Sequence, residues 1–172
     1  IVINSVNYQD GINGLAGGLV FISLIGFTLL SFVFANDFTL SISFISLGAV
    51  LALLIFNFPP AKIFMGDSGA YSLGFILAVI AMMFSKPFNI ASAMGPIFII
   101  GLPIFDGVFT NIRRIVNGKS IFLGDRSHFY DRLLQKGFST KKTLVICCFF
   151  QLLSVMLGLI LILYQSHGNC ML

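Results

Sequence analysis

A polar segment near the middle of the chain holds residue types that could do chemistry. Between Asn57 and Gly69 an amide, Lys62 and Asp67 stand among prolines and glycines, and long apolar runs flank the segment on both sides. Ionisable side chains are costly at membrane depth, and proline with glycine favours a loop over a packed helix. A site in this loop therefore explains the segment better than packing does, and Asp67 is its strongest candidate residue.

The composition places this segment in an integral membrane protein. Hydrophobic residues make up 58% of the chain and charged residues 9%, and the mean hydropathy is +1.02, whereas a soluble domain carries roughly a quarter charged residues. Continuous apolar runs that approach the roughly 20 residues of a membrane-crossing helix predict an all-α, polytopic bundle. About five transmembrane helices are expected, at Leu15–Ala35, Leu40–Phe56, Ala70–Phe84, Ile90–Ile112 and Thr143–Tyr164. The shortest run, Ala70–Phe84, also fits a re-entrant or core helix, although Gly66–Ser68 could extend it.

The basic residues predict how this bundle is oriented. Eight of the ten lysines and arginines lie between Arg113 and Lys142, and the positive-inside rule puts that loop in the cytoplasm. Counting helices backwards from it places the loops Asn4–Gly14 and Asn57–Gly69 on the same side. The aspartates of that side are Asp10, Asp67, Asp125 and Asp131, with Asp106 near the end of the fourth predicted helix, while Asp37 lies on the other side.

Aspartates gathered in glycine-rich loops suit a hard, oxygen-liganded cation. Mg²⁺ usually takes one or two protein carboxylates and shares its other positions with water and phosphate oxygens, so a phosphate substrate would complete such a site. The alternative for each aspartate is an ordinary solvated loop charge. In the first loop, Asx residues followed by glycines could cap a helix and leave its first amides free for a ligand. The alternative there is a plain cap and turn, with Gly14 and Gly18 allowing a close helix contact.

Four motifs in this order and spacing resemble a known family. They are Asn7-Tyr-Gln-Asp10-Gly-Ile-Asn13-Gly-Leu, Phe64-Met-Gly-Asp67-Ser-Gly, Pro103-Ile-Phe-Asp106 and Asp125-Arg126-Ser-His128. Together they resemble the polyprenyl-phosphate N-acetylhexosamine-1-phosphate transferases, over Asn4 to Gly137. The resemblance implies that a lipid phosphate in the membrane attacks the β-phosphorus of a UDP-N-acetylhexosamine, which gives a lipid-diphosphate-sugar and UMP. Such a reaction begins a lipid-linked cell-envelope glycan.

The resemblance also implies roles for residues at the matching positions. Asp67 is the expected ligand of Mg²⁺, with Mn²⁺ as an alternative cation. The expected nucleotide and substrate contacts are Asn7, Asp10, Gly11, Ile12, Asn13 and Asn57. Lys62 either contacts a phosphate or extends its charged end from the membrane to the interface.

The last motif supplies the remaining candidate residues. His128 is expected beside the sugar nucleotide, and Arg126 on the diphosphate. Asp106 either orients a site residue or pairs with Arg113 on the same helix face. Many relatives carry further histidines where this chain has Tyr130 and Asp131, which argues against the peptidoglycan-precursor branch.

The family's aspartate-rich motif, in which two aspartates are adjacent, has no counterpart in this chain. The simplest expectation is that residues 1–172 form a single membrane-embedded transferase domain whose amino-terminal half is missing. These residues would then be part of a larger bundle and inactive by themselves.

The expected partners are a UDP-N-acetylhexosamine and a polyprenyl phosphate in the cell membrane, with undecaprenyl favoured over dolichyl. A homodimer is compatible with the resemblance, and no nucleic acid is expected. The rival hypothesis is a noncatalytic multipass scaffold or transport protein, which would place ionisable residues inside helices rather than in loops on one side.

Overall fold

Helices are the regular secondary structure of the residues that the structure describes, and no strand occurs among them. The structure is a computed structural model that describes residues 1–85, 90–118 and 128–168. Its helices are α1 (Val2–Tyr8), α2 (Leu15–Val33), α3 (Asp37–Asn57), α4 (Gly66–Phe84), α5 (Ile90–Ile100), α6 (Leu102–Val116), α7 (Phe129–Gln135) and α8 (Thr140–Gly168). Four of them, α2, α3, α4 and α8, are long and apolar enough to cross a membrane, and α5 with α6 makes a fifth if the bent pair is one span. The predicted all-α membrane bundle is confirmed.

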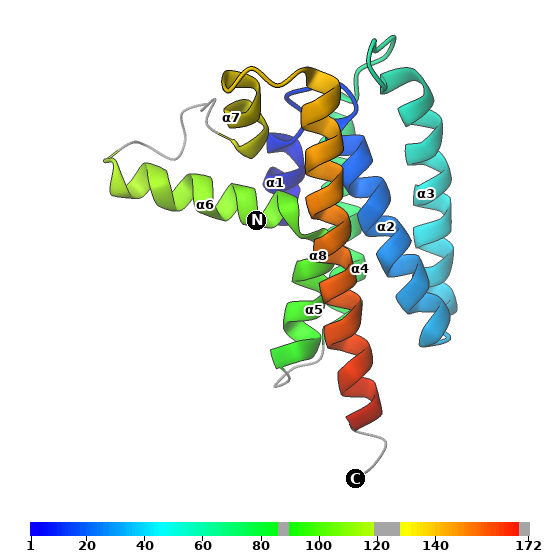
Figure 1. Cartoon of the computed structure of the whole chain (residues 1–172). Coiled ribbons are helices and arrows are strands. Elements are labelled where there is room, and N and C mark those ends of the chain that lie inside the picture. Colours follow the sequence, from blue (N-terminus) through cyan, green and yellow to red (C-terminus); the bar gives the residue numbers. More distant parts are fainter. Residues whose placement is uncertain (86–89, 119–127, 169–172) are drawn as a thin grey trace.

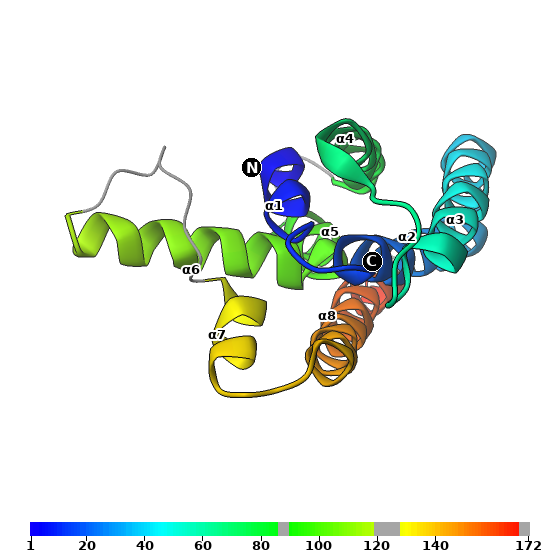
Figure 2. The ribbon, with the colours of Figure 1, turned by 90° about the horizontal axis from the view of Figure 1, so that it is seen from above.

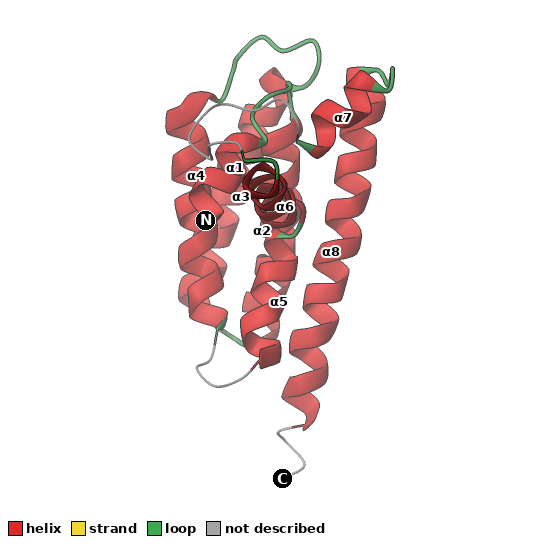
Figure 3. Cartoon of the chain, turned by 90° about the vertical axis from the view of Figure 1, so that its left-hand side faces the viewer, coloured by secondary structure: helices red, strands yellow, loops and turns green. Residues whose placement is uncertain are grey.

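The spanning helices stand side by side, with α2 at their centre (Figures 1 and 3). Helix α2 packs against α3, α4, α5 and α8, and its side chains Leu24, Phe27 and Leu30 are fully buried. Small residues allow close contacts, as expected where helices associate by packing in lipid. A Cβ on Gly158 of α8 would lie 2.6 Å from the carbonyl oxygen of Gly95 on α5. The helical backbones of α5 and α8 therefore nearly touch.

The prediction of one continuous helix over Ile90–Ile112 is wrong, because this run forms the bent pair α5 and α6. The chain turns by 90° between α5 and α6, and α6 runs across the bundle rather than through it (Figure 1). Gly101, at the turn, has φ +49°, and a Cβ there would overlap the Ser154 hydroxyl. Pro103 in the first turn of α6 favours a new helix start, because proline lacks the N–H that a continuous helix would use.

Two polar residues of α8 bind the backbone groups that this turn leaves without helical partners. The Leu102 N–H donates to Gln151 Oε1 at 2.8 Å, and Gln151 Nε2 donates to the Ile99 carbonyl at 2.8 Å. The Ser154 hydroxyl donates to the Phe98 carbonyl at 2.7 Å. Buried backbone groups in lipid need such partners, so Gln151 and Ser154 stabilise the turn. We call Ile100–Leu102 the elbow.

Two short helices lie where loops were expected. Helix α1 occupies the first part of the predicted loop Asn4–Gly14, and α7 lies within the predicted basic loop. Seen from above, α6 extends away from the bundle and α1 and α7 lie on either side of it (Figure 2). The extension of the third apolar run, Ala70–Phe84, to Gly66 is confirmed by α4. Gly14 and Gly18 do face Leu144 and Cys148 of α8.

Candidate active site

Polar segments from distant parts of the chain meet at one end of the bundle. They are the connection from α1 to α2, the connection from α3 to α4, and the beginning of α7, together with the side chain of Asp106 from α6. The convergence of these segments on one end was predicted from the sequence. Their contacts divide into two groups, one around Asp67 and one around Asp106.

The first group places two carboxylates near each other. Asp67 lies in the first turn of α4 and is exposed, and its Oδ1 accepts a hydrogen bond from Asn7 Nδ2 at 2.9 Å. Burial raises the pKa of Asp10, a hydrogen bond from the Gly66 N–H opposes the rise, and the charge of Asp67 adds to it. Asp10 is therefore close enough to Asp67 for their charges to repel.

This pair fits a magnesium ion in its donor chemistry. Two carboxylates, one of them exposed to solvent, match the usual protein share of a Mg²⁺ site, in which water and phosphate oxygens supply the other ligands. The described residues contain no group of three or more His, Cys, Asp or Glu side chains that could hold a metal.

Asn57 braces the loops that carry these carboxylates. Its side chain is 2% exposed. Its Oδ1 accepts from the Gly14 N–H at 2.8 Å, and its Nδ2 donates to the Ile63 carbonyl at 2.8 Å. These contacts join the end of α3 to both loops, which is a structural role. The nucleotide contact expected of Asn57 stays a prediction.

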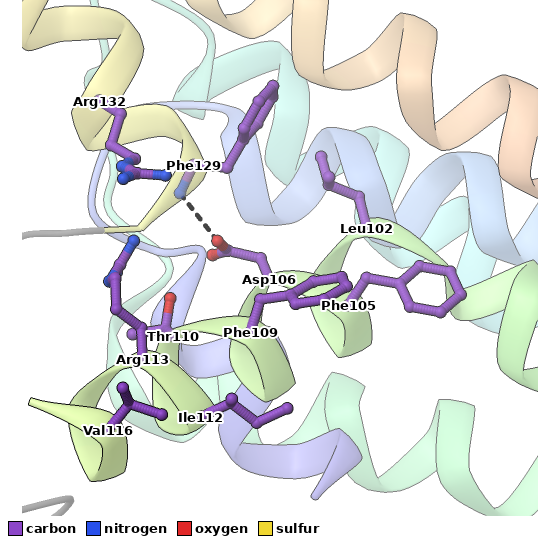
Figure 4. Close-up of a pocket in the computed structure, with 10 residues that line it drawn as sticks. All are labelled: Leu102, Phe105, Asp106, Phe109, Thr110, Ile112, Arg113, Val116, Phe129 and Arg132. Carbon is purple, nitrogen blue, oxygen red and sulfur yellow. Dashed lines mark hydrogen bonds between the residues drawn. The ribbon is translucent and has the colours of Figure 1, made fainter.

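The second group is built on Asp106, whose carboxylate is 8% exposed. Its Oδ2 lies 2.8 Å from Gln9 Nε2 and 2.9 Å from His128 Nδ1. Its Oδ1 accepts from the Phe129 N–H at 2.8 Å, the hydrogen bond drawn in Figure 4. An amide N–H can only donate, so the carboxylate acts as the acceptor. One buried side chain therefore joins the end of α1, helix α6 and the beginning of α7.

Aromatic rings cover His128. The ring centroid of His128 lies 5.2 Å from that of Tyr8 and 5.9 Å from that of Tyr130, with interplanar angles of 30° and 5°. Tyr130 also reaches the first loop, because a Cβ on Gly11 would overlap its hydroxyl. Glycine is thus needed at position 11, where Tyr130 packs on the loop. The imidazole of His128, which is 6% exposed, is held between the rings of Tyr8 and Tyr130.

Four consecutive residues serve both groups. Asn7 and Asp10 face Asp67 and the start of α4, whereas Tyr8 and Gln9 face His128 and Asp106. The segment lies where α1 ends and the chain turns toward α2. It therefore divides its side chains between the exposed carboxylates and the buried one.

A groove of about 550 Å³ opens beside Asp106. Figure 4 shows Arg113 and Arg132 near Asp106 at one end of it and Leu102 and Phe105 at the other. The remaining lining is mostly apolar and comes from α6 and α7: Phe109, Thr110, Ile112, Val116 and Phe129. The groove combines a cationic end with a long apolar surface.

Comparison with known proteins identifies the family. The family described as glycosyl transferase family 4 matches residues 1–85. The chain is 36% identical over 146 residues to the probable undecaprenyl-phosphate N-acetylglucosaminyl 1-phosphate transferase of Bacillus subtilis (strain 168), an alignment covering 84% of this chain and 41% of that protein. Residues 1–85 belong to glycosyl transferase family 4.

Other relatives of this family carry related names. The chain is 30% identical over 165 residues to the decaprenyl-phosphate N-acetylglucosaminephosphotransferase of Mycobacterium tuberculosis (strain ATCC 25618 / H37Rv), covering 84% of this chain and 41% of that protein. It is 42% identical over 109 residues to the phospho-N-acetylmuramoyl-pentapeptide-transferase of Dictyoglomus turgidum, covering 63% and 35%. The chain thus spans less than half the length of these family 4 relatives.

The site predicted from the family 4 motifs is only partly assembled by the described residues. Asn7, Asp10 and Asp67 come together, and Asp106 contacts His128, which favours the orienting role expected of Asp106. Lys62 and Gly11 are exposed and Asn13 is half-buried on their loops. Arg126 and Asp125 lie outside the described residues.

Sequence reasoning missed Tyr8, Gln9 and the contact role of Tyr130. Gln9 lies between two residues of the first family 4 motif, which was the available signal, but its partner is 97 positions away. Tyr130 was noted only as a departure from the family's histidines. In the structure this tyrosine packs on Gly11 and His128, so it joins the first loop to the histidine.

Proposed function

We propose that this chain forms part of an enzyme that transfers N-acetylhexosamine-1-phosphate from a UDP-sugar to a polyprenyl phosphate. The family match and the names of the relatives support this reaction class. The observation that carries the proposal is the meeting of the Asp10–Asp67 pair with the Asp106–His128 pair at one end of a membrane bundle, next to an apolar groove.

The reaction asks the protein mainly for positioning and charge neutralisation. An oxygen of the lipid phosphate forms a bond to the β-phosphorus of the UDP-sugar, the bond from that phosphorus to the oxygen bridging to the α-phosphate breaks, and UMP leaves with that oxygen. Phosphate chemistry of this kind needs little covalent participation by the protein and much alignment. The residues proposed below therefore bind, orient and neutralise.

The donor is proposed to bind over the first loop. Asn7, Asp10 and Asn13 offer amide and carboxylate contacts, and the exposed backbone of Gly11 lies on the same loop. Asp67 and Asp10 would hold Mg²⁺, or Mn²⁺ in its place. The cation, when bound, would neutralise charge on the diphosphate.

The acceptor is proposed to bind along α6. A prenyl chain matches the apolar part of the groove, and Arg113 and Arg132 provide positive charge for its phosphate at the end that contains Asp106. This arrangement would bring the acceptor phosphate close to His128. On this proposal His128 offers its second nitrogen, Nε2, as a contact to the sugar nucleotide or phosphate.

The location of the enzyme follows from its substrates and charge. The chain is a membrane protein, and its concentration of lysine and arginine between residues 113 and 142 favours a cytoplasmic position for the site by the positive-inside rule. We propose the cell membrane, with the site loops in the cytoplasm where a UDP-sugar would reach them.

The test is an exchange assay on the natural gene product that contains this chain, purified in detergent with polyprenyl phosphate. We expect Mg²⁺-dependent exchange of labelled UMP into UDP-N-acetylglucosamine, and a loss of at least about 100-fold in the Asp67→Asn variant. Asp37→Asn is the matched control, because Asp37 is exposed at the opposite end of the bundle. Folded protein that exchanges no UMP with any UDP-N-acetylhexosamine would contradict the proposal and favour a scaffold or transport role.

A further inference from the structure

Gln9 is a buried amide that contacts the most connected carboxylate of the site. The residue directly follows α1 and its side chain is 1% exposed. Its Nε2 donates to Asp106 Oδ2 at 2.8 Å, and the same oxygen lies 2.9 Å from His128 Nδ1. Burying an amide is costly unless its hydrogen bonds are made, so this side chain is fixed by the contact it makes with Asp106.

The contact restrains the Asp106 carboxylate. The torsion that rotates a carboxylate about its last carbon–carbon bond is broad and poorly restrained by the side chain itself. Here Gln9 and His128 hold one oxygen, and the Phe129 N–H holds the other at 2.8 Å. Removing the Gln9 donor would leave Oδ2 with His128 alone and would allow the carboxylate to rotate away from its present plane.

The orientation of Asp106 determines which nitrogen of His128 carries the proton. An ionised carboxylate only accepts hydrogen bonds, so Nδ1 is the protonated nitrogen and Nε2 of the neutral ring keeps its lone pair. Tyr8 and Tyr130 stack on the ring and limit its rotation. They cannot select the tautomer, because ring faces offer no directional acceptor in the plane of the imidazole. The tautomer is therefore selected by Asp106, and Gln9 takes part because it holds the Asp106 carboxylate in place.

We propose that Gln9 is a positioning residue for His128. Through Asp106 it keeps the imidazole in the Nδ1–H tautomer, with Nε2 available to the bound UDP-sugar. The importance of this tautomer for transfer rests on the proposed function. The structural part of the proposal, that Gln9 fixes the proton on Nδ1, is independent of the proposed function. Gln9 itself touches neither the donor nor the acceptor in this arrangement.

Two variants separate the hydrogen bond from the shape of the side chain. Gln9→Met keeps a side chain of similar length but removes the N–H donor. Gln9→Glu keeps the shape but places a carboxylate against Asp106, where like charges repel. The matched controls are Gln135→Met and Gln135→Glu, which make the same changes at an exposed glutamine of α7.

The direct measurement is nitrogen NMR of histidine-labelled protein in lipid nanodiscs, with the His128 signal assigned by its loss in His128→Gln. The wild type is expected to show the Nδ1–H tautomer as the main neutral species. Gln9→Met is expected to give a mixture, and Gln9→Glu a larger share of Nε2–H. In the exchange assay, kcat should fall about 10- to 100-fold in both Gln9 variants while the KM for the UDP-sugar changes by less than about 3-fold.

A wild type with mainly Nε2–H at His128 would overturn the inference, even if both Gln9 variants failed to fold. Folded Gln9 variants with the wild-type tautomer and wild-type kcat would overturn it as well. A wild type that shows the Nδ1–H tautomer but no exchange would contradict the proposed function and leave the structural part standing. The two failures can therefore be told apart.

Discussion

Asp67 and Asp106 are carboxylates of the same site with opposite surroundings. Asp67 is exposed and accepts a hydrogen bond from Asn7, whereas Asp106 is buried and is held by contacts from Gln9, His128 and Phe129. A carboxylate offers about four lone-pair positions. Asp67 keeps lone-pair positions that face solvent and can bind a ligand. Most lone-pair positions of Asp106 are occupied by contacts with Gln9, His128 and Phe129. On the proposed function, exposure would thus distinguish Asp67, which binds the cation, from Asp106, which positions His128.

The strongest way to break this comparison is the same substitution at both positions. Asp106→Asn would turn an amide N–H₂ toward groups that already donate, so we expect the free energy of unfolding to fall by about 2–4 kcal/mol. Asp67→Asn should change it by no more than about 0.5 kcal/mol. Thermal and denaturant unfolding of both variants in detergent would measure the difference. Equal losses of stability would show that burial does not separate the roles of the two residues.

A smaller effect is expected from the elbow that places α6 and Asp106. Gln151→Met keeps the length of the side chain but leaves the Leu102 N–H and the Ile99 carbonyl without their partner. We expect a loss of about 1–2 kcal/mol, because hydrogen bonds between membrane helices contribute modestly. The variant should also lower the exchange rate while leaving Mg²⁺ dependence unchanged.

Gln135→Met, at an exposed position, is the control for that experiment. If Gln151→Met changed the Mg²⁺ dependence instead of the rate, the Asp67 and Asp106 groups would not be separable as the comparison requires.

The smallest expected effect concerns Asp10 and depends on pH. Its pKa is raised in the folded protein, chiefly by burial, so the folded state binds this proton more tightly than the unfolded state does. The resulting stability is fully present below the ordinary pKa of an aspartate and is lost as the pH rises through the folded value. Asp10→Asn should therefore raise the unfolding temperature at pH 7 by about 1–3 °C when divalent cations are absent.

Three conditions sharpen this prediction. The advantage of Asp10→Asn should disappear at pH 3, where wild-type Asp10 is protonated, and it should shrink when Mg²⁺ is added, because the cation offsets the charge in the wild type. Asp37→Asn should show neither dependence. An Asp10→Asn variant that is less stable than the wild type at pH 7 without cations would contradict the argument.

The sequence was sufficient for the parts of the fold that depend on local composition. Continuous apolar runs predict α2, α3, α4 and α8, and glycine before the third run, Ala70–Phe84, predicts where α4 begins. The elbow was missed because an apolar run that contains glycine and proline is also compatible with one membrane helix. The bend is also stabilised by Gln151 in α8, whose side chain supplies backbone partners some 50 residues away.

The candidate site divides in the same way. Asn7, Asp10 and Asp67 were found because their motifs combine polar residues with glycine, and each motif is short. Gln9 was not, since no local pattern marks a glutamine whose partner comes from another helix. The sequence left Asp106 between two roles, and its contact with His128 favours the orienting one.

The turn from Asn7 to Asp10 has a consequence for how this protein can vary in length. Neighbouring residues there contact either the group around Asp67 or the group around Asp106. One added or deleted residue would therefore turn the wrong side chains toward both groups at once. A substitution damages a single contact, whereas a shift in spacing would damage them all. Tolerance to insertions should therefore be lowest in these four residues, where the chain makes what looks like an ordinary turn.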